Sequence, residues 1–394
     1  MSKTFLCISC EFKGHDFYKA CKAAGNKVFL VTNKNLENKP WNRANLDDIF
    51  FVEEKNNRAW DIAKLKKGLA YFMRSNKVDR IIALDDFDVE KAAALREHFR
   101  VPGMGETTSR YFRDKLAMRV KAQNAGLKVP PFSALFTDDE VNQFIADVPA
   151  PWVVKPRADA SAAGIQKVKN GHELWEAIHR LGDERDNYLV EQFKPGTVYH
   201  VDALIKNEKI IFVRTSKYLS TPFEVAHGGG IFRSVIVEFG SKEDKALQKM
   251  NKEVLQIFGM KMGASHTEFI QSDEDGEFYF LETSSRVGGA HLAEMVEYSS
   301  GINLWGEWAK LESAESKAET YKLPKVKKAY TGIVVSLSKF QQPDYASFTD
   351  SEIVWRLNKE YHIGMIIQAK TRKRVLELLD QYAVKINKEF HASV

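Results

Sequence analysis

Apolar and polar positions along the first hundred residues follow two alternating periods. Short apolar runs predict buried strands, and stretches with an apolar residue every three or four positions predict helices. The strands are expected at 5–9, 27–32, 49–52 and 80–84, and the helices at 16–24, 62–75 and 89–99. Because strands that alternate with helices form parallel sheets, residues 1–100 should be a small doubly wound α/β domain.

The pattern changes after residue 100, where strands outnumber helices. Strands are expected at 152–155, 188–192, 198–205, 209–215, 235–239 and in a hairpin containing 268 and 282. This region, residues 101–311, should be α+β with a largely antiparallel sheet. A charged stretch of low apolar content, 312–328, is expected to be a linker, and 329–394 should form a small C-terminal α+β region.

The predicted hairpin carries the most informative residues. A three-residue loop centred on Asp275, with Gly276 left-handed, would pair Glu268 directly with Glu282. Paired residues share one face of a sheet, with Cβ atoms roughly 5 Å apart. Two carboxylates that close repel each other unless a cation lies between them, which favours a divalent metal site. A solvated acidic face of the hairpin is the alternative.

Composition restricts the function classes. Apolar content of 44%, charged content of 28% and a net charge of +5 are typical of a globular protein without a nucleic-acid-binding arm. The chain has no apolar run of 18 residues, and its first residues have too short an apolar core for a signal peptide. We therefore expect a cytoplasmic protein that binds neither membranes nor nucleic acids.

Several segments before the hairpin suit a nucleotide. Lys115 lies on a basic helix, and Lys155 ends a strand that leads into a loop of small residues, 157–164. Lysines supply positive charge to phosphate oxygens, and a loop of small residues lets backbone amides approach them. The strand that ends at Glu191-Gln192-Phe193 can present backbone groups to the edge of a base.

In their order and spacing these segments resemble the ATP-grasp superfamily. The similarity covers residues 1–310 and is greatest to its carboxylate–amine ligase branch, including L-amino-acid and dipeptide ligases, with a further likeness to biotin-carboxylase-like enzymes. It implies an ATP-grasp fold: an N-terminal pre-ATP-grasp domain, a central nucleotide-binding domain and a small C-terminal region. It also implies ATP and Mg²⁺ as cofactors, with Mn²⁺ as an alternative.

The resemblance assigns a role to each of these residues. The α and β phosphates would be held by Lys115 and Lys155, under a lid containing Ser161 and Gly164. Adenine would be bound by Glu191 with the backbone of Gln192 and Phe193, and the metal by Glu268, Glu282 and Ser284. Arg286 would contact the transferred phosphate.

Two positions depart from the family pattern. Ser284 stands where the family usually has an asparagine, and a hydroxyl is a weaker magnesium ligand. Val198 replaces an acid that usually binds the ribose, a loss for which Asp202 or a water would have to compensate. The first departure concerns the number of metal ions, and the second concerns nucleotide affinity.

The implied reaction joins a carboxylate to an amine through an acyl phosphate, and the resemblance favours amino acids as both substrates. The substrate site is expected at Gly229, Gly230 and Arg233, whose guanidinium could pair with a carboxylate, and near His291. The alternative for these glycines and for Arg233 is a flexible surface loop, and for His291 a structural role at a helix start.

Two other functions remain open at this stage. One is phosphorylation of a different small carboxylate, as in biotin-carboxylase-like or purine-pathway enzymes, and the other is ATP binding without catalysis. Oligomeric state is also open, with a homodimer as one alternative.

Overall fold

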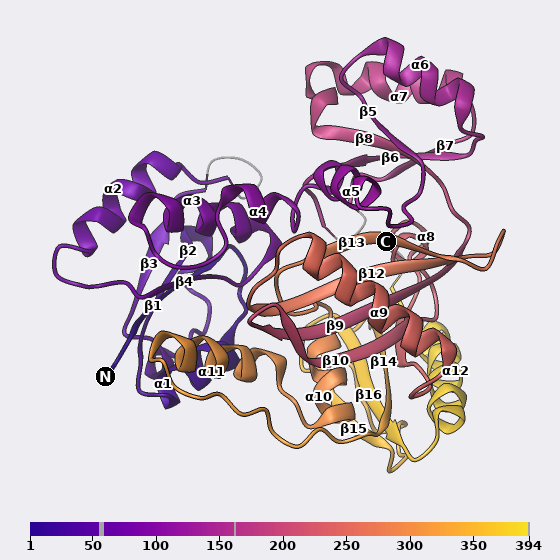
Figure 1. Ribbon diagram of the computed structural model, residues 1–394. Helices are drawn as coiled ribbons and strands as arrows, with labels where there is room; N and C mark the ends of the chain where they lie inside the picture. Colours follow the sequence, from indigo (N-terminus) through magenta and orange to yellow (C-terminus); the bar gives the residue numbers. More distant parts are fainter. Residues whose placement is uncertain (55–58, 161–162, 393–394) are drawn as a thin grey trace.

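The computed structural model describes residues 1–54, 59–160 and 163–392, and its strands form three sheets (Figure 1). The first sheet is built from β1 (Thr4–Ser9), β2 (Lys27–Asn33), β3 (Asp48–Val52) and β4 (Arg80–Ala83). Its order is β3-β2-β1-β4 and its pairings are parallel. The α-helices of this unit are α1 (His15–Ala23), α2 (Ile62–Phe72) and α3 (Val89–Phe99), and its short 3-10 helices are η1 (Lys34–Leu36), η2 (Arg43–Asn45) and η3 (Asp86–Asp88).

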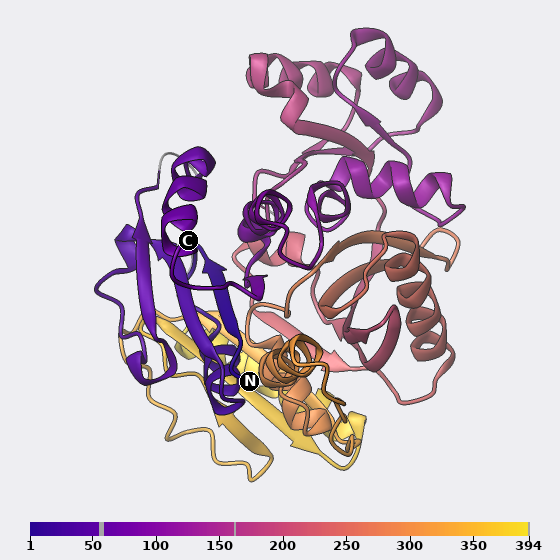
Figure 2. The same ribbon diagram turned by 60° about the vertical axis from the view of Figure 1, so that its left-hand side comes forward.

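A second, smaller sheet projects from the rest of the molecule (Figure 2). Its order is β5-β8-β6-β7, and its strands are β5 (Phe132–Ala134), β6 (Trp152–Pro156), β7 (Gln166–Val168) and β8 (Tyr188–Gln192). It is accompanied by α6 (Asp138–Asp147), α7 (Gly171–Leu181) and η4 (Gly182–Asn187). Two helices precede it in the chain, α4 (Glu106–Arg110) and α5 (Lys115–Asn124).

The third sheet has eight strands in the order β13-β12-β9-β10-β11-β14-β16-β15, and its pairings are antiparallel. The strands are β9 (Gly196–Lys206), β10 (Lys209–Tyr218), β11 (Phe232–Ile236), β12 (Gly263–Ser272), β13 (Phe278–Ser284), β14 (Tyr330–Leu337), β15 (Ile353–Arg356) and β16 (His362–Ala369). The remaining helices are α8 (Pro222–Gly228), α9 (Lys242–Ile257), α10 (Leu292–Ser300), α11 (Leu304–Ser316) and α12 (Arg372–Glu389).

Alternation along the strands gives this sheet two different faces. On β9, Tyr199, Val201 and Ala203 pack in one core with residues of α9. Val198, which points the other way, packs with Leu292 of α10. The polar residues His200 and Asp202 lie on the face of Val198, so this face combines a helix-covered apolar part with a polar part.

The C-terminal region is continuous with the large sheet. Its strand β14 pairs with β11, and β16 and β15 follow, so residues 329–394 contribute three strands to the same sheet. The amphipathic helix α12 buries Val375, Leu378 and Leu379 against these strands. The expected α+β elements are present, but they extend the central sheet instead of forming a separate unit.

The predicted linker, 312–328, starts before the preceding helix has ended. Helix α11 continues to Ser316, so the first five positions of 312–328 are helical. Glu312 is buried beside Arg80 of β4, with 3.3 Å between its Oε2 and the arginine Nε. The linker prediction treated Glu312 as a solvent-exposed charge. In the structure it is buried, because its partner Arg80 lies on a strand more than 200 positions away in the chain.

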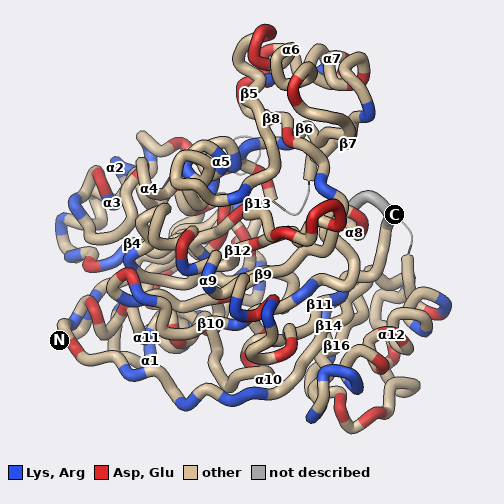
Figure 3. The backbone as a smooth tube through the Cα atoms, turned by 45° about the vertical axis from the view of Figure 1, so that its right-hand side comes forward, with Lys and Arg blue, Asp and Glu red and all other residues tan. Residues whose placement is uncertain are grey.

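Helix α11 connects the N-terminal sheet to the rest of the molecule. Trp308 of α11 packs edge-on against Phe17 of α1, with ring centroids 5.1 Å apart, which ties α11 to the N-terminal sheet. Basic and acidic positions are interspersed over all parts of the backbone (Figure 3). Among the described residues, each helix is too short or too polar to cross a membrane.

A close backbone approach between β9 and β12 generates a stability prediction. A Cβ on Gly196 would lie 2.1 Å from the carbonyl oxygen of Gln271, whereas a Cβ on Gly68 in α2 would meet nothing within 4 Å. Gly196→Ala should lower the free energy of unfolding by about 1–3 kcal/mol. Gly68→Ala should raise it by roughly 0.5–1 kcal/mol, because alanine loses less backbone entropy in a helix. Urea unfolding of both variants checks the contrast, and equal effects would contradict it.

Candidate active site

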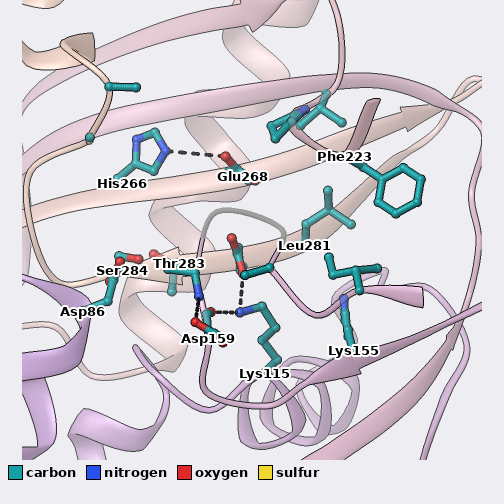
Figure 4. Close-up of a pocket in the computed structure, with 18 of the residues that line it drawn as sticks. Asp86, Lys115, Lys155, Asp159, Phe223, His266, Glu268, Leu281, Thr283 and Ser284 are labelled. Carbon is teal, nitrogen blue, oxygen red and sulfur yellow. Dashed lines mark hydrogen bonds and ion pairs between the residues drawn. The ribbon is translucent and has the colours of Figure 1, made fainter. Parts of the chain in front are cut away.

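A cavity of about 390 Å³ lies where the three sheets meet (Figure 4). Asp86 reaches it from the N-terminal unit, Lys115 from α5 and Lys155 from β6. The large sheet contributes Glu268 from β12 and Glu282 from β13, together with the other lining residues of these strands. Residues from widely separated parts of the chain therefore converge on one charged pocket.

The hairpin register places the two glutamates opposite each other. Glu268 pairs with Glu282, as expected, but the turn is not the predicted three-residue loop. The amide of Ser272 donates to the carbonyl of Glu277, which leaves a four-residue turn ending in left-handed Gly276. A β-bulge between Glu268 and Phe269 shifts the register back. The expected pairing of Glu268 with Glu282 is therefore present because the bulge offsets the extra residue in the turn.

Each glutamate has a different partner. Glu282 Oε2 lies 3.0 Å from Lys115 Nζ, and Glu268 Oε1 accepts a hydrogen bond of 2.8 Å from the hydroxyl of Tyr218. Burial favours a higher pKa for Glu282, but Lys115 and Lys155 outweigh it and hold that pKa below its usual range. Two paired carboxylates that open into one cavity are oxygen ligands suited to a magnesium ion.

Glu191 occupies a different position from the one expected. It is buried, and its two oxygens accept hydrogen bonds of 2.7 Å from Lys155 Nζ and 2.5 Å from Arg119 Nε. The guanidinium of Arg119 also donates to the carbonyl of Leu281. The carboxylate of Glu191 is thus committed to two cations instead of facing an adenine, because a buried charge needs partners of opposite sign.

Two of these interactions have consequences for the neighbouring groups. Burial lowers the pKa of Lys155 to about 8, although Glu191 acts in the opposite direction. The backbone amides of Gln192 and Phe193 donate to the carbonyls of Pro131 and Pro151, at 2.8 and 3.0 Å. The backbone amides of these two residues are therefore engaged by neighbouring loops, and neither residue lines the cavity.

A hydrogen-bonded histidine network, which sequence reasoning missed, lies behind Glu268. Asp202 accepts from the Nδ1 atoms of His200 and His266, each at 2.8 Å, and His266 Nε2 lies 3.6 Å from Glu268 Oε1. Burial favours a lower pKa for His266, but Asp202 and Glu268 raise it to about 9. His266 is therefore positively charged at neutral pH and lies on the cavity wall.

The same trio is also a candidate metal cluster by distance. Within the described ranges, His200, Asp202 and His266 are the group whose potential ligand atoms lie within 4.8 Å of one another. The three are buried, and His200 Nε2 is in addition 2.8 Å from the hydroxyl of Ser234. Because the ring nitrogens of His200 are already engaged, this cluster is better described as a proton-bonded network. Asp202 is hydrogen-bonded to these histidines and does not line the cavity.

Arg286 is paired with an acid from the N-terminal unit that sequence reasoning also missed. Its Nε and Nη2 donate to Asp86 Oδ2 at 2.9 and 2.5 Å. Burial favours a higher pKa for Asp86, but Arg286, Ser284 and Arg113 lower it to about 2. The one sequence signal was the acidic end of the fourth strand, Asp85-Asp86, at the carboxyl edge of a parallel sheet.

Other expected residues fall at or near the cavity. Ser284 lines it beside Asp86 (Figure 4). Val198, at the sequence position of the expected ribose acid, lines it with an apolar side chain. Gly164 lies between Ala163 and Ile165, which are both lining residues. Ser161 lies outside the described residues.

The expected substrate residues lie elsewhere. Arg233 alternates with Phe232 and Ser234 on β11 and so points to the face covered by α12, where its Nη1 lies 2.6 Å from Asp380 Oδ1. It does not line the cavity. The structure does not support its assignment to a substrate carboxylate in this cavity, because strand parity turns its side chain away from the pocket.

The glycines and His291 differ from the expectation as well. The predicted loop before Gly229 is helix α8, whose start has a capping box made by Thr221 and Glu224. Gly229 and Gly230 follow this helix outside the cavity lining, whereas Phe223 and Val225 of α8 line it. His291 packs on Trp355 with ring centroids 4.9 Å apart, and its Nδ1 lies 3.1 Å from Glu294. These contacts fit the structural alternative for His291.

Comparison with known proteins identifies the fold. Residues 148–294 match the family described as ATP-grasp domain. The chain is 24% identical over 265 residues to an L-arginine-specific L-amino acid ligase of Bacillus subtilis, covering 66% of this chain and 62% of that protein. It is 25% identical over 203 residues to a D-alanine–D-alanine ligase of Marinobacter nauticus, covering 48% and 59%.

A solved structure extends the similarity over the whole chain. The crystal structure of an L-amino acid ligase from Bacillus licheniformis superposes with a TM-score of 0.77 at 18% identity, covering 99% of this chain and 98% of that one. At this identity the match shows the fold. The aligned regions of the two relatives above span about three fifths of their own lengths, 62% and 59%.

The buried ion triad generates a second prediction. Glu191→Gln removes the charge that compensates Arg119 and Lys155, which leaves two buried cations close together. The free energy of unfolding should fall by about 3–5 kcal/mol. Glu176→Gln, on an exposed side chain of α7 next to His172, is the control and should change it by less than about 0.5 kcal/mol. Chemical unfolding measures both, and a Glu191→Gln variant as stable as the control would refute the account.

Proposed function

We propose that this member of the ATP-grasp superfamily is an ATP-dependent ligase that joins a carboxylate to an amine and releases ADP and phosphate. The observation that carries the proposal is the facing pair Glu268 and Glu282, with Lys115 at 3.0 Å from the latter, in a cavity that also holds Lys155 and Arg286. Acids that bind a metal and cations that bind phosphates are the groups phosphoryl transfer needs.

Each charged group has a function in this scheme. Glu268 and Glu282 would hold magnesium or manganese, which would neutralise charge on the phosphates of ATP. Lys115 and Lys155 supply positive charge to the same phosphates. Arg286 and His266 face the cavity and stabilise negative charge that develops as the substrate carboxylate attacks the γ-phosphate. An amine then attacks the acyl phosphate, and phosphate leaves as the amide forms.

Amino acids are the proposed substrates. The names of two relatives, an L-arginine-specific L-amino acid ligase and a D-alanine–D-alanine ligase, describe enzymes that act on amino acids. The cavity combines a charged wall with an apolar part formed by Tyr218, Phe223 and Phe232. A charged end and an apolar end match the backbone and side chain of an amino acid.

The test is ADP release with ATP and magnesium over a panel of amino acids, singly and in pairs. Ligase activity predicts turnover that depends on a carboxylate and an amine, with a product of the mass expected for an amide. Turnover that needs no amine would favour phosphorylation of another carboxylate. Nucleotide binding without turnover of any panel member would favour a non-catalytic protein and sink the ligase proposal.

A variant pair tests the metal site. Glu282→Gln should reduce ADP formation by roughly 100-fold or more, because it removes a preorganised group worth about 3–4 kcal/mol. Glu277→Gln is the matched control, since Glu277 belongs to the same hairpin and pairs with Lys128 at the surface. Raising magnesium should partly rescue only the first variant. Equal activities of the two variants would contradict a role for Glu282.

A further inference from the structure

Asp86 lines the cavity and has a buried carboxylate oxygen that makes no hydrogen bond among the described residues. It begins η3, directly after β4, and its side chain reaches the pocket from the N-terminal unit. Only 5% of the residue is exposed. Oδ2 accepts both hydrogen bonds from Arg286, whereas Oδ1 is buried and makes no hydrogen bond among the described residues, although the hydroxyl of Ser284 is close enough to the carboxyl to lower its pKa.

A buried carboxylate oxygen without a partner is costly, so its position calls for a ligand. Leaving a buried acceptor unsatisfied costs more than an average hydrogen bond contributes. Because Asp86 lines the cavity, a donor bound there lies next to its carboxylate. The best donor for a carboxylate is a cation.

The neighbouring Arg286 gives the pair its selectivity. A guanidinium has five N–H groups. Arg286 donates to Asp86 through Nε and Nη2 and to the carbonyl of Val287 through Nη1. Each terminal nitrogen therefore retains a second N–H. The cavity wall therefore presents a negative and a positive group side by side, an arrangement complementary to a zwitterion.

We propose that Asp86 binds the α-ammonium group of the substrate whose carboxylate is activated, and so selects α-amino acids over other carboxylic acids. This inference rests on the proposed ligase function. The ammonium of the carboxylate donor stays charged throughout the reaction and is suited to a permanent ion pair. The attacking amine must instead lose its proton, and a carboxylate contact would hold it in the unreactive ammonium form.

Two other roles for Asp86 fit the structure less well. The proposed magnesium site is the facing pair Glu268 and Glu282 on adjacent strands of the large sheet, whereas Asp86 reaches the cavity from the N-terminal unit. A purely structural link between the N-terminal unit and the segment after β13 would need only Oδ2 and gives no reason for a second, buried oxygen without a hydrogen bond.

The experiment compares Asp86→Asn with Asp85→Asn. Asparagine keeps the size of the side chain and an oxygen for Arg286 but removes the charge. Asp85 is a matched control, because it is also 5% exposed and adjacent in sequence. Its oxygens are occupied by the amide of Phe87 and the ammonium of Lys13, and it does not line the cavity.

The readout is discrimination between two acids that differ only in the amino group. The amino acid of the panel with the fastest turnover is compared with its desamino acid, for example phenylalanine with 3-phenylpropionate, by kcat/KM for ADP release. The wild-type protein should prefer the amino acid, and Asp86→Asn should reduce that preference by about 10- to 100-fold. Asp85→Asn should retain it, and the KM for ATP should change little in either variant.

The remaining outcomes would overturn either the assignment of Asp86 or the proposed function. Unchanged discrimination in Asp86→Asn, or a raised magnesium requirement with discrimination retained, overturns the assignment. If Asp86→Asn fails to fold, the wild-type protein still decides, because equal turnover of the acids with and without the amino group refutes the proposal. Absence of ADP release with every amino acid would instead overturn the proposed function itself.

Discussion

The buried pairing of Glu191 with Lys155 and Arg119 is the constraint on which the site depends. Glu191 lies on β8 and Lys155 on β6, so the pair fixes one side of the small sheet. Arg119 lies on α5 and also donates to the carbonyl of Leu281 on β13. A single carboxylate thereby joins the small sheet, α5 and the large sheet around one cavity. Because buried charges need compensation, the three parts cannot separate without exposing or stranding a charge.

The same principle of paired opposite charges governs the rest of the pocket. Asp202 compensates the positive His266, and Asp86 compensates Arg286. Lys115 in turn lies beside Glu282. These pairs keep a high density of both signs in place, so the groups are oriented before any substrate enters. Catalysis by charge stabilisation benefits from this arrangement, since little reorganisation is needed during the reaction.

Much of the fold could be predicted from local pattern. The strand–helix alternation at the N-terminus is present as a parallel sheet, and the strand-rich middle is present as an antiparallel one. The facing of Glu268 and Glu282 was also predicted, although the loop length was wrong and a bulge restored the register. Local spacing indicated which residue types would meet, but not how the backbone accommodates them.

Long-range contacts lay beyond that reasoning. Arg233 and Phe232 are adjacent in sequence, but only the sheet and α12 decide which of them faces the cavity and which faces Asp380. Glu312 has the local sequence of an exposed linker charge, and only the folded structure brings it next to Arg80. Asp86 and Arg286 are 200 positions apart, and no local period connects them.

The sequence by itself therefore determined the elements, the fold class and the chemical types of the site, because periodicity and motif order are local properties. Only the tertiary structure decided the partners of each charge. The free energy of a buried charge depends on what surrounds it in three dimensions, and for Glu191, Asp202 and Asp86 the partners come from other strands and helices.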